Sequence, residues 1–246
     1  MKYGICHLSV IPIRAEANHY SVQQSQLLYG ELFKVLEHRK QFSKIRSVYD
    51  GFEGWIDKLH YKEITQELFD ELKERPSSFN YNLVHYVQID NKSLMPVVIG
   101  ALLSNATSLN HTTEISKIPE QHSIVHTAMM FLNSPSIQGG RSPFGIDNGG
   151  LSQMAYKLNG FTLKRTAKEQ SLQGEPLSFI EEAKAGDLAF FDNKEGVIDH
   201  VGILLENNYI IHAYGAVRID RIDHTGIFNL ETNTYTHSLR VIKSLI

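Results

Sequence analysis

The first part of the chain alternates apolar and polar residues over short runs, a pattern typical of β-strands. The runs GICHLSVIPIRAE, QLLYGELFKVLEHR and FSKIRSVYDGFEGWIDKLHY contain or adjoin turn residues such as Asp50-Gly51. Several short strands within about 60 residues are typical of a small barrel. We therefore predict a small all-β barrel over residues 1–61.

The pattern becomes helical after this barrel. In KEITQELFDELKER, residues 62–75, an apolar stripe through Ile64, Leu68, Phe69 and Leu72 opposes a charged face, and Pro76 ends the run. We expect a linker helix over residues 62–76. Residues 77–119 alternate weakly through YNLVHYVQI and MPVVIGALL, which predicts a second small strand-rich module.

Residues 120–246 have a different texture, with helices first and strands afterwards. EQHSIVHTAMMFLN predicts an amphipathic helix, the loop QGGRSPFG leads to a second helix, and EPLSFIEEAK predicts a short third one. The strand-like runs that follow are GDLAFFD, HVGILLE, NYIIHAY, VRIDRI and SLRVIK. Helices followed by a run of antiparallel strands indicate the α+β class.

The second of these helices has an unusual start. Asp147 is a suitable N-cap, and Asn159-Gly160 is a suitable C-terminal stop. The first turn contains Asn148, Gly149 and Gly150, although glycine costs roughly 1 kcal/mol relative to alanine in a helix interior. This composition indicates that something other than helix propensity selects these residues.

Composition excludes several classes of protein. The 246 residues are 42% hydrophobic with a formal net charge of -3, so a packed core is expected and a basic nucleic-acid-binding face is not. No apolar run approaches the roughly 20 residues of a membrane span. The chain shows no signal peptide, so we expect a cytoplasmic protein, or a periplasmic or exported one if a leader was removed. The oligomeric state stays open.

The single cysteine, Cys6, does not look catalytic. It shares strand parity with Leu8 and Val10, which predicts that it faces a core, and no neighbouring residue in the sequence would lower its pKa. It has no intramolecular disulfide partner, which fits a reducing compartment.

Two histidines on adjacent predicted strands are the strongest chemical signal. His200 opens one strand and His212 lies near the end of the next, with a tight turn between them. Hairpin neighbours can place two such side chains on one face, one as base and the other orienting it. The alternative is a pair of structural sheet histidines. A nucleophile for such a base belongs at a helix N-terminus, where this chain has Asn148.

Four motifs occur in an order that resembles the NlpC-type cell-wall cysteine peptidases, which have a papain-like fold: GGRSPFGID-x-x-G, AGDLAFFDN, DHVGILL and IIHA. The resemblance covers residues 121–246. The front part resembles the bacterial SH3-like modules that precede the peptidase domain in some members. The subgroup it is most similar to comprises γ-D-glutamyl-L-diamino acid endopeptidases, which cut murein peptides.

The resemblance implies a site in which His200 is the general base and His212 the orienting residue. The nucleophilic cysteine of the family stands in D-C-S-G, and here that motif reads Asp147-Asn148-Gly149-Gly150. Both the cysteine and the serine after it are therefore replaced. A natural loss of catalysis explains two replacements better than a single laboratory substitution does.

Other positions of the resembled site also differ. The P-Y-x-W-G-G motif has become PSIQGG, with Ser136 and Gln138 at the aromatic positions, and R-D-x-S has become RTAK, with Thr166 at the acidic position. The resemblance places these residues, with Asp147 and Gly149, around the substrate. It also assigns Glu16, Tyr49 and Trp55 of the first barrel, less directly, to the side that fixes the amine end.

The expected architecture is thus a papain-like domain over residues 120–246, preceded by two small all-β SH3-like barrels. We expect a catalytically inactive relative that binds a murein-derived peptide or a protein partner, because a carboxamide is not a nucleophile at neutral pH. The alternative is an active γ-D-glutamyl endopeptidase of peptidoglycan recycling, or hydrolysis by a water that His200 activates.

We expect no cofactor and no metal. His122 and His126 have the i, i+4 spacing of a ligand pair on a helix, but an exposed helix face is the simpler interpretation. The loop GGRSPFG lacks the lysine and hydroxyl residue of a P-loop, so a nucleotide site is not expected.

Overall fold

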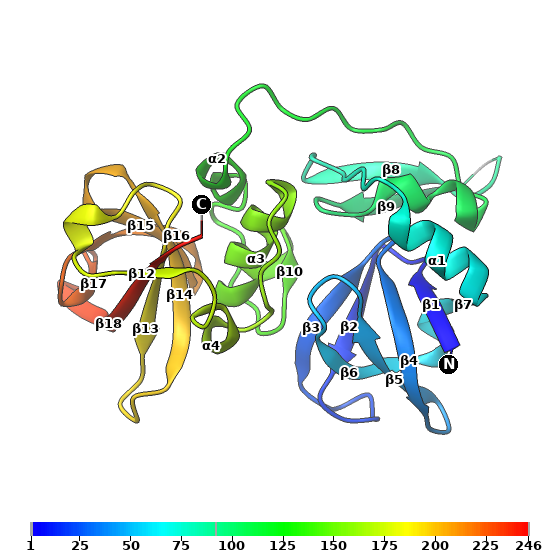
Figure 1. The fold of residues 1–246 in the computed structure, drawn as a ribbon, viewed down its shortest axis with the longest axis horizontal. Helices are drawn as coiled ribbons and strands as arrows, with labels where there is room; N and C mark the ends of the chain where they lie inside the picture. The colour runs from blue at the N-terminus through cyan, green and yellow to red at the C-terminus, as the bar shows by residue number, and fades with distance from the viewer. Residues whose placement is uncertain (1, 92, 246) are drawn as a thin grey trace. The chain divides into compact units, whose positions relative to one another are not determined.

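The computed structural model describes residues 2–91 and 93–245, and the chain divides into two compact units (Figure 1). The first unit comprises Met1–Glu120 and Gln138–Pro143, and the second comprises Gln121–Ile137 and Phe144–Ile246. The short segment 138–143 thus interrupts the second unit in sequence, within the predicted domain 120–246. The two units are described separately below.

The first unit is built on a seven-stranded antiparallel sheet with the order β3-β2-β6-β5-β4-β1-β7. Its strands are β1 (Lys2–Cys6), β2 (Val10–Arg14), β3 (Gln23–Leu28), β4 (Leu32–His38), β5 (Phe42–Ser47), β6 (Glu53–Asp57) and β7 (Tyr61–Ile64), with the 3-10 turn η1 (Lys58–His60) before β7.

This sheet curls because side chains from all seven strands meet in one core. The core contains Cys6, Ile11, Ile13, Leu27, Phe33, Val35, Ile45, Ile56 and Tyr61, all of them buried. Gly30 and Gly51 allow the tight turns, since both have positive φ values, of 79° and 77°. The predicted small barrel is therefore present at the front of the chain.

A second core lies on the outer face of β1. Tyr3 and Ile5, which alternate with the inward-facing residues of that strand, pack with Phe69 and Leu72 of α1 (Gln66–Glu74). The predicted helix start at residue 62 is wrong, because Tyr61–Ile64 pair with β1 and Thr65 then caps the helix. Residues 62–64 therefore form part of a strand, although the apolar spacing of the run also fits a helix.

Residues 77–119 contribute less regular structure than a complete barrel needs. Their described residues form the two-stranded sheet β8 (Val84–Gln88) and β9 (Leu94–Val98), followed by η2 (Leu103–Asn105) and η3 (Thr107–Leu109). Val87 and Val97 pack into the same core as Tyr3 and Phe69. The subdivision of the chain into modules at 61, 76 and 119 stays a prediction.

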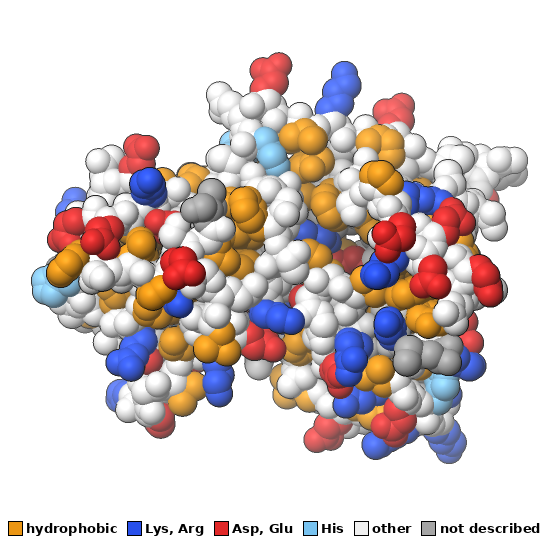
Figure 2. All heavy atoms as spheres, viewed as in Figure 1, with side chains coloured by type: hydrophobic (Ala, Val, Ile, Leu, Met, Phe, Trp, Pro, Cys, Tyr) orange, Lys and Arg blue, Asp and Glu red, His pale blue; other side chains and the backbone are white. Residues whose placement is uncertain are grey.

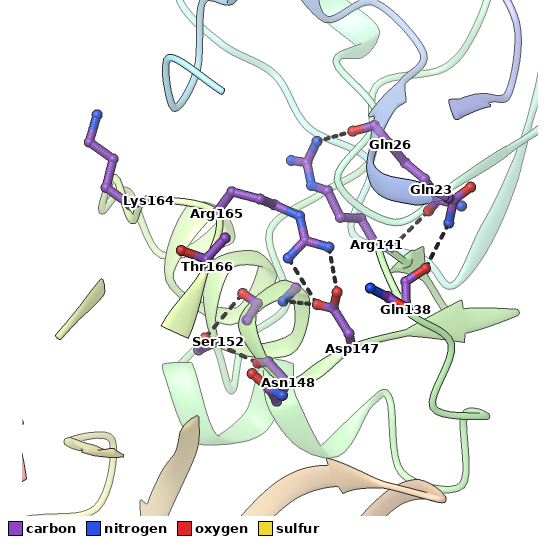
Figure 3. A network of polar contacts seen from close by, with 12 residues as sticks. Gln23, Gln26, Gln138, Arg141, Asp147, Asn148, Ser152, Lys164, Arg165 and Thr166 are labelled. Carbon is purple, nitrogen blue, oxygen red and sulfur yellow. Dashed lines mark hydrogen bonds and ion pairs between the residues drawn. The ribbon is translucent and has the colours of Figure 1, made fainter. Parts of the chain in front are cut away.

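The segment 138–143 is fixed to the first unit by a buried ion pair. It contains β10 (Arg141–Ser142), and the Arg141 guanidinium donates to both carboxylate oxygens of Glu31 at 3.0 Å. Arg141 also donates to the Gln26 carbonyl at 2.7 Å (Figure 3). Both charged side chains are almost fully buried, so the loss of either partner would leave an uncompensated charge.

The second unit is built on strands β12–β18, all antiparallel, in the order β12-β18-β13-β14-β15-β16-β17, and β17 also pairs with β18. This last pairing closes β13–β18 into a barrel. Its bounds are β12 (Glu175–Leu177), β13 (Leu188–Asp192), β14 (Ile198–Leu205), β15 (Tyr209–Tyr214), β16 (Ala216–Ile222), β17 (Gly226–Asn229) and β18 (Thr234–Ser244), with η5 (Glu206–Asn208) between β14 and β15.

The helices of this unit are α2 (Ile124–Met129), α3 (Asn148–Leu158) and α4 (Ala167–Gln170), and β11 (Gly145–Ile146) precedes α3. All three helices pack against β14 (Figure 1). The helix predicted in EPLSFIEEAK is wrong: β12 pairs there with β18, and only η4 (Ile180–Glu182) follows. The mixed α and β composition confirms the predicted class.

The distribution of charged side chains and the polarity of the helices agree with what the composition predicted. Acidic and basic side chains are interspersed over the face seen in Figure 2 rather than separated by sign. Within the described residues, the helices are all too short or too polar to span a membrane.

The first turn of α3 requires glycine at position 149. A Cβ atom built on Gly149 would lie 2.6 Å from the Arg165 carbonyl oxygen, so the segment that carries Arg165 can approach the helix only if this side chain is missing. Close backbone approach therefore outweighs the low helix propensity of glycine at this position.

We predict that Gly149→Ala lowers the free energy of unfolding by about 1–3 kcal/mol, although helix propensity alone would raise it. Asn148→Ala is the matched control, because Asn148 already carries a Cβ atom. Calorimetric unfolding of both variants checks this, and a Gly149→Ala protein as stable as the wild type would contradict it.

Candidate active site

Pleat alternation places three titratable side chains on the inner face of the second barrel. His200 shares strand parity with Leu204 on β14, His212 with Ile210 on β15, and Asp220 with Ile222 on β16. The three apolar partners belong to the barrel core. The polar residues therefore continue the core layer along three adjacent strands, and all three are buried.

These residues form a continuous hydrogen-bonded relay, which we call the histidine relay: His200, His212 and Asp220. His200 Nε2 lies 2.9 Å from His212 Nδ1, and His212 Nε2 lies 3.0 Å from Asp220 Oδ2. Because the carboxylate accepts, His212 donates from Nε2, and its Nδ1 accepts from His200 Nε2–H when both rings are neutral. His200 then has an unprotonated Nδ1, the state a general base requires.

The carboxylate end of the relay is anchored by an arginine. Arg218 donates to both oxygens of Asp220, at 2.8 and 3.1 Å, and also contacts Glu231 at 3.2 Å. Although burial opposes ionisation, the bonds from His212 and Arg218 hold the pKa of Asp220 below its usual value. Asp220 therefore stays charged and keeps the His212 ring in one orientation.

Burial holds two imidazoles neutral, those of His200 and His237. Burial, with the nearby His237 and His212, lowers the pKa of His200 well below its ordinary value. His237 of β18 stacks on His200 with ring centroids 3.9 Å apart, and burial lowers its pKa to about 4. The neutral rings of His200 and His237 thus lie beside His212 at one end of the barrel.

A glycine makes room for the contact between the two relay histidines. Gly202 pairs with His212 across β14 and β15, and a Cβ atom on it would lie 2.6 Å from Ile210 Cδ1 and 3.1 Å from His212 Cβ. Because Gly202 has only a hydrogen atom in place of a side chain, the side chains of Ile210 and His212 can pack closely against β14. This explains the glycine in the sequence DHVGILL.

The N-terminus of α3 presents Asn148 beside the strand that carries His200. The half-buried Asn148 donates from its side-chain amide to the carbonyl of Asp199, the residue before His200, at 3.3 Å. As predicted, Asp147 caps the helix, accepting from the Gly150 amide at 2.7 Å. A carboxamide thus lies at the helix N-terminus beside the His200 strand, and its assignment as the nucleophile position stays a prediction.

Asp147 also pairs with Arg165, which lies almost fully buried next to it (Figure 3). The Arg165 guanidinium donates to both carboxylate oxygens, at 2.9 and 2.8 Å. The exposed Thr166 that follows caps α4 in a reciprocal bond with Glu169. The loop after α3 is therefore fastened to the start of that helix, and the predicted binding roles of Asp147, Gly149 and Thr166 stay predictions.

The remaining predicted site residues are distributed over both units. Ser136 lies in the second unit, where its amide donates to the Gly215 carbonyl. Glu16, Tyr49, Trp55 and Gln138 belong to the first unit. Trp55 is buried under the Arg39 guanidinium, and Arg141 lies 5.9 Å from the centre of the Tyr49 ring. Their roles in binding stay predictions.

Two functional residues escaped the sequence reasoning. Asp220 had a weak signal, because it shares parity with Ile222 in VRIDRI and so places a carboxylate on the inner face. His237 had none, because it lies in the polar run TYTHS and reaches the cluster through the pairings of β18 with β13 and β17.

The structure also tests the predictions made for Cys6 and for the pair His122 and His126. Cys6 is buried, as predicted, and burial raises the pKa of its thiol well above the usual value. The helical spacing predicted for His122 and His126 is wrong: Ser123 caps α2, so His122 precedes the helix and its Nε2 lies 2.7 Å from the Leu158 carbonyl.

The depressed pKa of His237 predicts a loss of stability in mild acid. Above pH 6.5 the ring is neutral in both states, so this stabilisation is complete. Between pH 6.5 and about 4 the unfolded chain binds a proton that the folded one does not, so the free energy of unfolding falls. We expect His237→Asn to flatten this decline, measured by denaturant titration from pH 7 to 4. The exposed His224→Asn is the control, and equal pH slopes in both variants would contradict the assignment.

Comparison with known proteins identifies the families to which parts of the chain are similar. The NlpC/P60 family model matches residues 135–236, and a model described as a bacterial dipeptidyl-peptidase Sh3 domain matches residues 13–60. Dipeptidyl-peptidase 6 of Lysinibacillus sphaericus is 36% identical over 232 residues, covering 81% of this chain and 83% of the relative. A gamma-D-glutamyl-L-lysine dipeptidyl-peptidase of Bacillus subtilis is 25% identical over 218 residues, covering 78% and 73%.

Solved structures support the fold. A crystal structure of an NlpC/P60 family protein from Bacillus cereus matches with a TM-score of 0.77 at 19% identity, over 98% of this chain and 99% of that one. Together with the full-length relatives, this confirms the SH3-like and papain-like resemblances. The chain belongs to the NlpC/P60 family, with a bacterial dipeptidyl-peptidase SH3 domain in its first unit.

Proposed function

We propose that this protein binds a peptide of the murein γ-D-glutamyl class without hydrolysing it. The peptide class is suggested by relatives named gamma-D-glutamyl-L-lysine dipeptidyl-peptidase. The absence of hydrolysis is suggested by the residue at the N-terminus of α3. A protein partner that presents a similar peptide segment would fit the same proposal.

The single observation that carries the proposal is Asn148. It takes the place at which a thiolate would be activated by the helix dipole and by a neighbouring imidazole. A carboxamide does not form the covalent intermediate, and loss of the nucleophile in a hydrolase triad costs on the order of a million-fold in turnover. Binding energy elsewhere in the site does not supply an attacking atom.

The retained relay supports a role in binding. With His200 neutral and its Nε2 bonded to His212, His200 Nδ1 is a hydrogen-bond acceptor of fixed direction. The Asn148 side chain adds an oxygen acceptor next to its amide donor. Such fixed donors and acceptors suit recognition of peptide N–H and C=O groups, because little side-chain entropy is lost on binding.

The relay also supports a second candidate function, hydrolysis by an activated water. An unprotonated His200 Nδ1 could take a proton from water instead of a thiol. This mechanism would make the protein an active cell-wall peptide hydrolase. It requires His200 to take up a proton, whereas peptide binding uses His200 only as a hydrogen-bond acceptor.

We expect the tripeptide L-Ala-γ-D-Glu-L-Lys to bind, measured by isothermal calorimetry, and to remain uncleaved in the same sample, measured by chromatography. Turnover that is abolished by His200→Ala would contradict the proposal and favour the water mechanism. Failure of the tripeptide to bind would also contradict it, whatever the turnover.

We further expect Asn148→Cys to gain hydrolysis of this tripeptide, because the base and its orienting residues are in place. Asn148→Ala is the matched control, since it removes the amide without adding a thiol, and it should stay inactive. An inactive Asn148→Cys protein that still binds the tripeptide would contradict a preserved catalytic geometry.

A further inference from the structure

We propose that His200, His212 and His237 form a binding site for a transition-metal ion, with Zn²⁺ the best match. One ring nitrogen from each of the three lies within 4.8 Å of the other two. We call this set the three-histidine cluster. Sequence reasoning did not find it, because β18 reaches this end of the barrel only through its pairings with β13, the neighbour of β14, and with β17.

The donor set defines the class of ion. Three neutral imidazoles suit Zn²⁺, Cu²⁺ or Ni²⁺, whereas Ca²⁺ and Mg²⁺ prefer oxygen ligands. Three histidines and one open position are also the ligand set of several zinc sites. Burial lowers the pKa of His200 and of His237, which favours the neutral rings that metal ligation requires.

The spacing requires a small adjustment of the relay. His200 Nε2 and His212 Nδ1 are 2.9 Å apart, whereas two nitrogens about 2.05 Å from a tetrahedral Zn²⁺ are about 3.3 Å apart. An opening of about 0.4 Å would let the ion replace the proton shared by the two rings. His237, whose ring stacks on His200 at 25° and lies at 86° to His212, supplies the third nitrogen by turning toward the other two, which lie within 4.8 Å of it.

The groups behind the ligands are those that metal sites use. Asp220 accepts from the far nitrogen of His212 at 3.0 Å, the arrangement of a carboxylate–histidine–metal triad. His237 Nδ1 lies 2.9 Å from the Thr236 hydroxyl, which leaves its Nε2 for the ion. Two of the three rings are therefore oriented before the ion arrives.

The cluster also has a route to solvent. His237 is only partly buried, and it lines a hollow of about 510 Å³ with Asp192, Asn193, Thr225, Tyr235 and Ser238. An ion can therefore reach the ring of His237 from this hollow.

This proposal does not rest on the proposed peptide-binding function, and the two fail separately. Zn²⁺ binding is measured without peptide, and peptide binding is measured in the presence of a chelator. If the zinc-loaded protein cleaved L-Ala-γ-D-Glu-L-Lys, the peptide proposal would fail and the metal proposal would stand.

The test is a competition titration of the purified chain with Zn²⁺ and a chromogenic chelator. We expect one Zn²⁺ per chain, and a dissociation constant at least roughly tenfold higher for His237→Asn. The exposed His224→Asn is the matched control and should bind as the wild type does. Equal affinity in both variants, or no stoichiometric binding by the wild type, would overturn the proposal.

A second measurement does not depend on a variant's folding. Wild-type protein titrated with Co²⁺ should develop the strong visible absorption of a four- or five-coordinate nitrogen-ligated ion, and Zn²⁺ should abolish it. A spectrum that stays that of hexaaqua cobalt would overturn the proposal.

Discussion

The hydrogen bond between His200 and His212 is the contact on which the site depends. It exists because Gly202 leaves room for the β15 side chains and because Asp220, held by Arg218, fixes the outer ring. Asp220 fixes the orientation of the His212 ring, and His212 in turn fixes that of the His200 ring. One carboxylate therefore determines the tautomer of both imidazoles when they are neutral. Closure of the barrel by β17 and β18 then adds His237 to the same end.

The helix beside the His200 strand is held in place by its own first turn. Asp147 caps α3 and pairs with Arg165, and Gly149 admits the Arg165 backbone, so the start of the helix stays fixed in place. The proposal of lost catalysis therefore rests first on Asn148, at the position where the family resemblance implies a cysteine. The same imidazoles, with no thiolate to activate, are free to bind a ligand or a metal ion, which is why both proposals begin at this end of the barrel.

The sequence predicted the parts of this architecture that local patterns encode. Strand alternation, the Asp147 cap and the spacing of His200 and His212 are local, and each was confirmed. Residues 62–64 and EPLSFIEEAK were predicted as helix because tertiary pairing with β1 and β18 is invisible to a helical period. Asp220 and His237 were missed for the same reason: sheet register and barrel closure, not neighbouring residues, bring them to His200. Placement of Gln138–Pro143 in the first unit likewise depends on a long-range ion pair, that of Arg141 with Glu31.

The central claim is that a working base still faces an empty nucleophile position. It is tested most directly by the alkylation rate of Asn148→Cys with iodoacetamide at pH 6, in the presence of a chelator. Cys6 gives little background, because it is buried and its pKa is raised. The account predicts fast alkylation that a second substitution, His200→Ala, slows strongly, because an ordinary thiol with a pKa near 8.5 is almost fully protonated at that pH. A slow rate that does not depend on His200 would contradict it.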